Sequence, residues 1–134
     1  MKYISGFQAL NLECPLNTPG DWHQDNIDWN NINLLESDDS QFKDWGIFVS
    51  RKIPGHIGED FFVANHIRAI LDILQTKSLN ELKGFRHDFI CDETLNNTIF
   101  EKVFELKNSP NWDKIDKIMS KEYYKLWRQF KEKM

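Results

Sequence analysis

The chain has 134 residues and a formal net charge of −4, with hydrophobic residues making up 40% and aromatic residues 13% of it. This length fits one domain around a single core, and this apolar content excludes a disordered chain. Because proteins that bind nucleic acid are usually basic overall, the negative balance argues against that role for the whole molecule. The charge is unevenly spread: residues 1–60 carry 4 basic and 10 acidic side chains, whereas residues 61–134 carry 13 and 11.

The sequence also indicates the cellular compartment in which we expect the protein. No apolar run reaches the length of about 18 residues that a membrane-spanning helix needs. The first residues, MKYISGFQAL, lack the apolar centre of a signal peptide. Cys14 and Cys91 stand far apart and in no metal-binding or redox spacing. We therefore expect a cytoplasmic protein without a membrane segment, whose two cysteines are reduced and pack as small buried hydrophobic side chains.

Alternating apolar residues predict three strands in the first part of the chain. These strands are ALNLECPL (9–16), NIDWNNINLL (26–35) and DWGIFVSRKIP (44–54), with polar or Pro-Gly turns around them. Between the second and the third, the acidic stretch ESDDSQFKD is typical of a surface loop.

From Gly58 onward the apolar residues recur with the period of a helix. EDFFVANHIRAILDILQ (59–75) predicts a central helix that is buried on most sides. Its narrow exposed stripe holds four polar residues: Asn65, Arg68, Asp72 and Gln75. Arg68 and Asp72 are four residues apart, so we expect them to pair on that stripe. Capping and stop residues predict further helices over 78–84, 92–108 and 109–133.

Together these elements predict a single α+β domain over residues 1–134. Its architecture is a small N-terminal antiparallel sheet followed by three to four helices. Residues 1–57 form the part rich in strands and loops, and residues 58–134 form the helical part.

The last predicted helix has two chemically different sides. One side is apolar and carries Ile115, Ile118, Met119, Tyr123, Leu126 and Phe130, with Tyr124 and Trp127 at its edges. The opposite side is basic and carries Lys114, Lys117, Lys121, Lys125 and Arg128. Such a run of like charges is either a solvated surface or a contact with an acidic partner or a nucleic-acid backbone.

The stretch GDWHQDNIDW (20–29) places His23 between Trp22 and Trp29, beside Asp21 and Asp25. Three interpretations fit this pattern. The tryptophans can close the edge of the core, with the aspartates ending its turns. They can equally anchor a basic protein partner that the carboxylates select. In the third interpretation, His23 is a base oriented by a carboxylate.

Three further side chains are catalytic candidates by residue type: His66, Arg68 and His87. His66 lies on the apolar side of the predicted central helix, where a hydrogen-bonded core histidine is the more common role. The histidines have no HxH, HExxH or HxxxH spacing, so we expect no metal site and no cofactor. The chain also lacks a phosphate-binding glycine loop and a nucleophile elbow, which argues against familiar nucleotide-using enzymes and hydrolases.

Several motifs resemble a set of short bacterial proteins with no established activity. The motifs are YISGFQALN, GDWH, ESDDSQF, DWGI, KIP, ANHIRAILDIL and DFICDE, between Tyr3 and Glu93. That set is associated with toxin–antitoxin and phage-defence neighbourhoods. The resemblance implies an antitoxin-like protein that binds another protein, and it implies no catalytic residues.

Three hypotheses for function follow from the sequence. The first is a protein-binding component of a bacterial two-component or defence system, which acts through Asp21, Trp22, Asp25 and Trp29 or through Trp127 and the basic side of the last helix. The second is a small histidine-dependent enzyme, such as a nuclease or a transferase-like toxin. The third is nucleic-acid binding through the last helix. The oligomeric state stays open.

Overall fold

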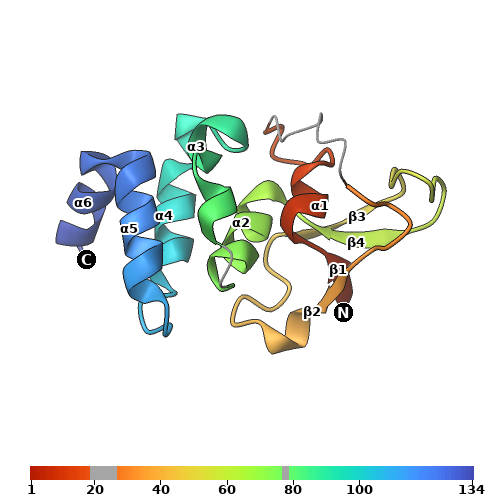
Figure 1. Ribbon diagram of the computed structural model, residues 1–134, viewed down its shortest axis with the longest axis horizontal. Coiled ribbons are helices and arrows are strands. Elements are labelled where there is room, and N and C mark those ends of the chain that lie inside the picture. The colour runs from red at the N-terminus through yellow and green to blue at the C-terminus, as the bar shows by residue number, and fades with distance from the viewer. Residues whose placement is uncertain (19–26, 77–78) are drawn as a thin grey trace.

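The computed structural model describes residues 1–18, 27–76 and 79–134 and has the predicted α+β fold in a single domain. The strands are β1 (Lys2–Ile4), β2 (Leu34–Glu36), β3 (Ile47–Ser50) and β4 (Phe61–Ala64). The α-helices are α1 (Gly6–Leu10), α2 (His66–Leu74), α3 (Phe85–Asp88), α4 (Asn96–Phe104), α5 (Trp112–Tyr123) and α6 (Lys125–Glu132). Short 3₁₀ turns lie at Ser37–Asp39, Leu79–Leu82 and Glu93–Leu95. Figure 1 shows the sheet at one end, α4–α6 at the other and α2 between them.

The sheet has the strand order β2-β1-β4-β3. Its outer pairs, β1–β2 and β3–β4, are antiparallel, as predicted. The central pair is parallel, with Ile4 opposite Val63, so the sheet is mixed rather than wholly antiparallel. Parallel neighbours need a long connection, and residues 5–60 supply it between β1 and β4.

Only one of the three predicted strands is present at its predicted place, and that is β3 within residues 44–54. Residues 9–16 alternate in polarity but begin in α1 and continue as turns, in which the amides of Asn11 and Leu12 donate to helix carbonyls. Among the described residues 27–35, only Leu34 and Leu35 belong to a strand, β2. The two central strands, β1 and β4, were not predicted.

The predicted central helix over 59–75 is two elements. Its first apolar residues form β4, which therefore lies inside the part predicted to be helical. Asn65 ends the strand and caps α2, because its side chain accepts a hydrogen bond of 2.8 Å from the amide of Arg68. The helix accordingly starts at His66.

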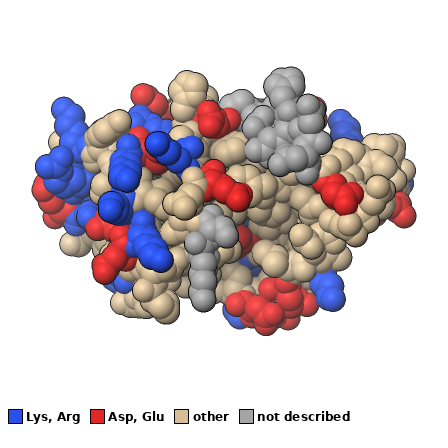
Figure 2. Space-filling view, viewed as in Figure 1, with Lys and Arg blue, Asp and Glu red and all other residues tan. Residues whose placement is uncertain are grey.

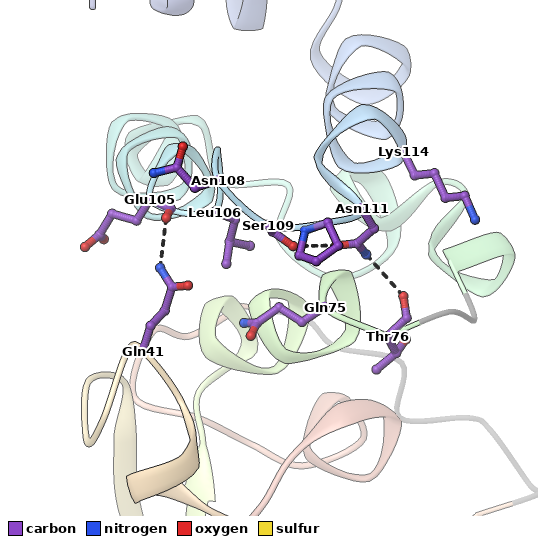
Figure 3. A pocket seen from close by; sticks show the side chains of 10 residues that line it. Gln41, Gln75, Thr76, Glu105, Leu106, Asn108, Ser109, Asn111 and Lys114 are labelled. Atoms are coloured by element: carbon purple, nitrogen blue, oxygen red, sulfur yellow. Dashed lines mark hydrogen bonds between the residues drawn. The ribbon is translucent and has the colours of Figure 1, made fainter.

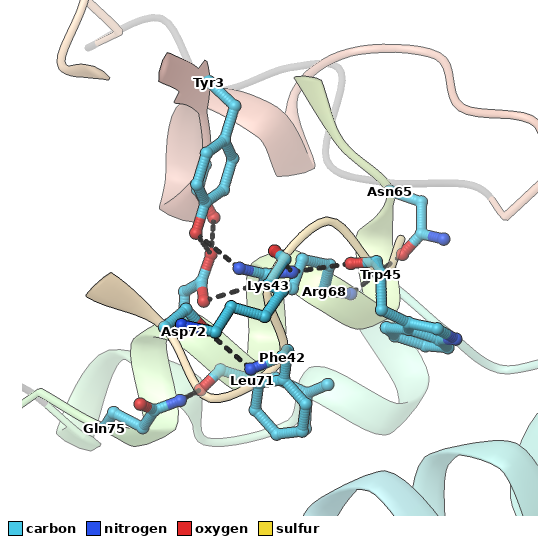
Figure 4. Close-up of polar contacts among 11 residues, drawn as sticks. Tyr3, Phe42, Lys43, Trp45, Asn65, Arg68, Leu71, Asp72 and Gln75 are labelled. Atoms are coloured by element: carbon cyan, nitrogen blue, oxygen red, sulfur yellow. Dashed lines mark hydrogen bonds and ion pairs between the residues drawn. The ribbon is translucent and has the colours of Figure 1, made fainter. Parts of the chain in front are cut away.

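The predicted pair between Arg68 and Asp72 forms, with Nε of Arg68 3.1 Å from Oδ1 of Asp72, but its exposed position was wrong. Arg68 is fully buried and Asp72 nearly so. Around the guanidinium, Nη1 donates to the carbonyls of Lys43 (2.7 Å) and Trp45 (2.6 Å), and Nη2 donates to the Tyr3 hydroxyl (2.9 Å). Figure 4 shows these groups converging from β1, α2 and the loop before β3. A buried charge needs such partners, because its loss of hydration is otherwise uncompensated.

The loop that supplies the two carbonyls depends on Gly46. Its φ of +77° lies in the left-handed region, and a Cβ added there would lie 2.8 Å from the Cβ of Arg68. Its carbonyl accepts a 2.7 Å hydrogen bond from the amide of Asn65, so the loop also holds the start of α2. Glycine is therefore required at this position by both conformation and space.

The predicted long helix over 109–133 starts later and breaks once. It begins at Trp112, and it is divided at Tyr124, whose φ of 53° and ψ of −128° are a strained conformation for a non-glycine residue. The break resets the helical phase, so Trp127 rather than Leu126 faces inward. Trp127 is fully buried and contacts Phe100, Trp112 and Phe130, while Leu126 is 39% exposed. The predicted edge position of Trp127 was wrong.

No helix of the described residues combines the length and the apolar character that crossing a membrane would need.

The Gly46 constraint predicts a stability difference between two glycine substitutions. Gly55 has nearly the same φ, +78°, but no atom lies within 4 Å of a Cβ built there. Gly55→Ala should lower the free energy of unfolding by about 1–2 kcal/mol through conformational strain alone. Gly46→Ala should lower it further, because its methyl group also displaces Arg68. Urea unfolding of both variants measures the difference, and equal losses would contradict the steric role of Gly46.

Candidate functional site

The best-defined cluster of hydrogen-bonded polar residues beside a cavity is centred on His66, the first residue of α2. Its side chain is fully buried. Nε2 lies 2.7 Å from the backbone carbonyl of Leu12, and Nδ1 contacts the hydroxyl of Thr18, which is itself 4% exposed. The candidate catalytic histidine therefore joins two distant parts of the chain, residues 12–18 and the start of α2.

The partners of His66 fix the position of its ring proton. A carbonyl oxygen only accepts, so Nε2 carries the hydrogen that is donated to Leu12. In the neutral ring Nδ1 is then an acceptor, and the hydroxyl of Thr18 donates to it. This leaves the lone pairs of Thr18 Oγ1 free to accept another hydrogen bond.

Cys14 supplies that hydrogen bond. Its sulfur lies 3.4 Å from Thr18 Oγ1, so the thiol donates to a hydroxyl that in turn donates to His66. The turn at residues 14–17 makes this possible: Pro15 favours it, and the amide of Asn17 donates to the carbonyl of Cys14 over 3.1 Å. The chain therefore returns Thr18 to the side of the cysteine.

The same surroundings make the thiol more acidic than usual. Partial burial by itself raises the pKa of Cys14, but hydrogen bonds with His66 and Thr18 stabilise the thiolate form, outweigh this effect and lower the pKa to about 7. One of these bonds comes from the backbone N–H of His66, at the N-terminus of α2, where a helix favours negative charge. A larger fraction of this thiol is therefore ionised at neutral pH than of an ordinary cysteine.

Cys14 also lines a surface cavity of about 390 Å³. The other lining residues are Asn11, Leu12, Glu13, Pro15, Phe48, Ser50, Lys52 and Pro54. Lys52 and Glu13 form an exposed ion pair of 3.9 Å, so this pair adds no net charge. The thiol is half-buried and unpaired with any other cysteine. A small molecule or a side chain of a partner can therefore reach the sulfur.

The remaining catalytic candidates do not join His66. The side chain of His87 is 94% exposed and lies 3.4 Å from Asp88, so it does not share the buried site. Arg68 is occupied in the core by the contacts described above. His23, with Asp21, Trp22 and Asp25, lies outside the described residues.

Of the predicted binding residues, those on the last two helices divide into two groups. Trp127 is in the core and is not available to a partner, which corrects the predicted binding role of its ring. Lys114, Lys117, Lys121, Lys125 and Arg128 are all exposed. Trp29 packs against the core, half-buried, and its carbonyl accepts a 3.0 Å hydrogen bond from His56.

A larger cavity of about 540 Å³ lies between the end of α2 and the start of α5. Figure 3 shows that amide and hydroxyl groups line it. Several of them are already bonded: Gln41 donates to the carbonyl of Glu105 (2.8 Å), and Asn111 donates to that of Leu74 (2.7 Å). These bonds tie the loop after β2 and the end of α2 to the helical end, which gives the cavity a structural role.

Within residues 1–18, 27–76 and 79–134, no three potential metal-ligating side chains gather into one group.

Comparison with protein-family models, with curated proteins and with solved structures finds no match. The resemblance to proteins of toxin–antitoxin neighbourhoods therefore stays a prediction, and function is argued from the residues themselves.

Sequence reasoning selected His66 but not its partners. Both cysteines were expected to be small buried side chains, whereas Cys91 is exposed and Cys14 is half-buried beside a base. The four-residue spacing of Cys14 and Thr18 around a Pro-containing turn was the available local signal. The 52 residues from Cys14 to His66 carry no motif that connects them.

The hydrogen bonds from Cys14 through Thr18 to His66, here called the relay, predict that removing the Thr18 hydroxyl shifts the pH dependence of Cys14 alkylation. Thr18→Val removes the hydroxyl at nearly constant volume, so the midpoint of Cys14 alkylation should rise from about 7 toward the ordinary thiol value of about 8.5. The rate with iodoacetamide is followed by mass spectrometry in a Cys91→Ser background. Thr18→Ser keeps the hydroxyl and should keep the midpoint low. If Thr18→Val and Thr18→Ser give the same pH dependence of alkylation, Thr18 does not take part in the relay.

Proposed function

We propose that this protein is a thiol-dependent enzyme in which Cys14 is the nucleophile and His66 is its base. The observation that carries the proposal is the continuous series of hydrogen bonds from the Cys14 thiol through Thr18 to Nδ1 of His66, oriented by the carbonyl of Leu12. A nucleophile, a base and a group that orients the base are the parts that covalent catalysis needs. The open cavity beside the sulfur supports the proposal, because it gives a substrate access.

The proton path follows from the hydrogen bonds. The thiol proton moves to Thr18 Oγ1 while the proton of the Thr18 hydroxyl moves to Nδ1 of His66. The resulting imidazolium keeps its Nε2–H bond to Leu12, and the thiolate is stabilised at the N-terminus of α2.

The sulfur lone pair then forms a bond to an electrophilic carbon of the substrate, such as an acyl carbon. The bond to the leaving group breaks with its electron pair, and the proton on Nδ1 returns through Thr18 to that group. Water that attacks the acyl-sulfur bond releases the acid and regenerates the thiol.

The environment of the cavity limits the substrate by size and shape. Phe48, Pro15 and Pro54 give it apolar walls, and Asn11 and Ser50 add polar side chains. The proposed substrate is therefore a small electrophile, or an electrophilic group on a larger molecule, that reaches the sulfur through this cavity.

An activated ester tests the proposal directly. With p-nitrophenyl acetate, the Cys91→Ser protein should release nitrophenol in a burst and gain one acetyl group, located at Cys14 by peptide mass spectrometry. Cys14→Ser should abolish the burst, and Thr18→Val should slow it by about 10² or more, the usual range for a base contribution.

The matched control compares the two cysteines in the same fold. A Cys14→Ser protein that keeps Cys91 presents an exposed thiol without a histidine base and should acylate slowly. Acylation of Cys91 as fast as that of Cys14 would contradict the proposal. A Cys14 that acylates at the same rate with and without Thr18 would also contradict it.

A further inference from the structure

Five exposed cations lie on the last two helices, α5 and α6. Several cations elsewhere have a carboxylate partner, including Arg51, Lys102 and Arg86. Ten lysines and arginines have no ion pair within the described part of the chain, and half of these are exposed on α5 and α6: Lys114, Lys117, Lys121, Lys125 and Arg128. We call these five residues the basic face. Figure 2 shows basic side chains gathered over this end of the molecule, with acidic ones beside them.

Two of the acidic residues on the same helices are engaged elsewhere. Asp116 accepts from the Trp127 indole and from Lys131, each at 2.7 Å. Burial raises the pKa of the Asp116 carboxyl, but these hydrogen bonds outweigh it and hold the pKa below its usual value. Glu122 accepts from the amide of Arg86 at 3.1 Å. Asp116 is therefore paired with Lys131, which is not part of the basic face. Within the described residues, no ion pair joins Asp113, Glu122 or Glu132 to the basic face.

Tyr124, at the break between the helices, is the second feature of this surface. It has a φ of 53° and a ψ of −128°, a conformation that glycine adopts far more readily than any other residue. Its side chain is nevertheless 71% exposed, so burial recovers little of the strain. Its amide donates to the carbonyl of Ser120 (2.9 Å), and its carbonyl accepts from the amide of Arg128 (3.5 Å), so its backbone joins α5 to α6. In the sequence it follows Lys121 by three residues and directly precedes Lys125.

We propose that the basic face and Tyr124 together bind single-stranded nucleic acid. The cations would contact phosphates, and the exposed ring would stack on a base, which is the combination that single-strand binding proteins use. A stacking role also accounts for an aromatic residue at a position where conformation alone favours glycine.

The negative net charge of the whole chain does not prevent nucleic-acid binding at the basic face. Three of the acidic residues, Glu36, Asp38 and Asp39, lie at another surface, around β2 and the turn after it. At an ionic strength of about 0.1 M, charges more than about 10 Å apart are largely screened. Contacts at the basic face therefore depend mainly on its own cations and on the carboxylates of the same two helices.

Fluorescence anisotropy with a labelled single-stranded RNA of about 12 nucleotides measures the binding. If all five cations contact phosphates, the logarithm of the association constant should fall with the logarithm of salt concentration with a slope of about −3.5. Lys117→Glu with Lys121→Glu should weaken binding and flatten the slope by about 1.4. Lys2→Glu with Lys83→Glu changes the net charge equally at exposed lysines elsewhere and should leave binding nearly unchanged.

Variants of Tyr124 separate stacking from folding. Tyr124→Gly relieves the strain, so its melting temperature should be equal to or above that of the natural protein, while RNA affinity falls roughly tenfold, as for loss of one base–aromatic stack. Tyr124→Phe keeps the ring and should retain the affinity.

Three outcomes would overturn the proposal. One is the absence of salt-dependent RNA binding. Another is binding that Tyr124→Gly and the Lys117/Lys121 reversal leave unchanged. The third is binding of poly-glutamate as tight as that of RNA and independent of Tyr124, which would assign the basic face to an acidic protein instead.

Discussion

The buried guanidinium of Arg68 is the interaction on which the arrangement of this protein depends. It connects β1 through Tyr3, the loop before β3 through two carbonyls, and α2 through Asp72, which also accepts from Ser5 at 2.6 Å. Burial and the neighbouring Asp72 raise the pKa of Tyr3 to about 12, so its hydroxyl remains a donor to that carboxylate. A charge at this depth is tolerated only when every element around it is in place, which couples the sheet to the central helix.

The thiol site is a consequence of that coupling. Gly46 holds both the carbonyl loop and Asn65, and Asn65 caps α2 immediately before His66. The position of His66 is therefore set by the same contacts that satisfy Arg68. On the other side, the turn that follows α1 presents the carbonyl of Leu12 to the ring, and the next turn presents Cys14 and Thr18. In the proposed mechanism, Cys14 held in this way needs little reorganisation before it reacts.

The sequence predicted interactions that are local and missed those that depend on distant partners. The pairing of Arg68 with Asp72 follows from their spacing, but their burial depends on Tyr3 and on residues 43–45, which no helical pattern includes. The interior sheet pair was missed because β1 has only three residues and because Asn65, the single residue between β4 and α2, also fits the exposed stripe of one continuous helix. Trp127 was misplaced because a strained residue reset the helical phase just before it, and a periodic pattern assumes a continuous helix.

Tyr124 and Arg68 show the same physical principle at opposite ends of the molecule. Each is unfavourable alone, one in backbone conformation and the other in burial of charge, and each persists because its neighbours compensate. At the helical end the compensation is an aromatic cluster: Trp127 stacks on Phe130 at 5.8 Å and packs edge-on against Phe100 at 5.5 Å. The break turns Trp127 into the core and leaves Tyr124 exposed, between Lys121 and Lys125 in the sequence. The core of the helical end thereby determines which aromatic side chain remains available for an external contact.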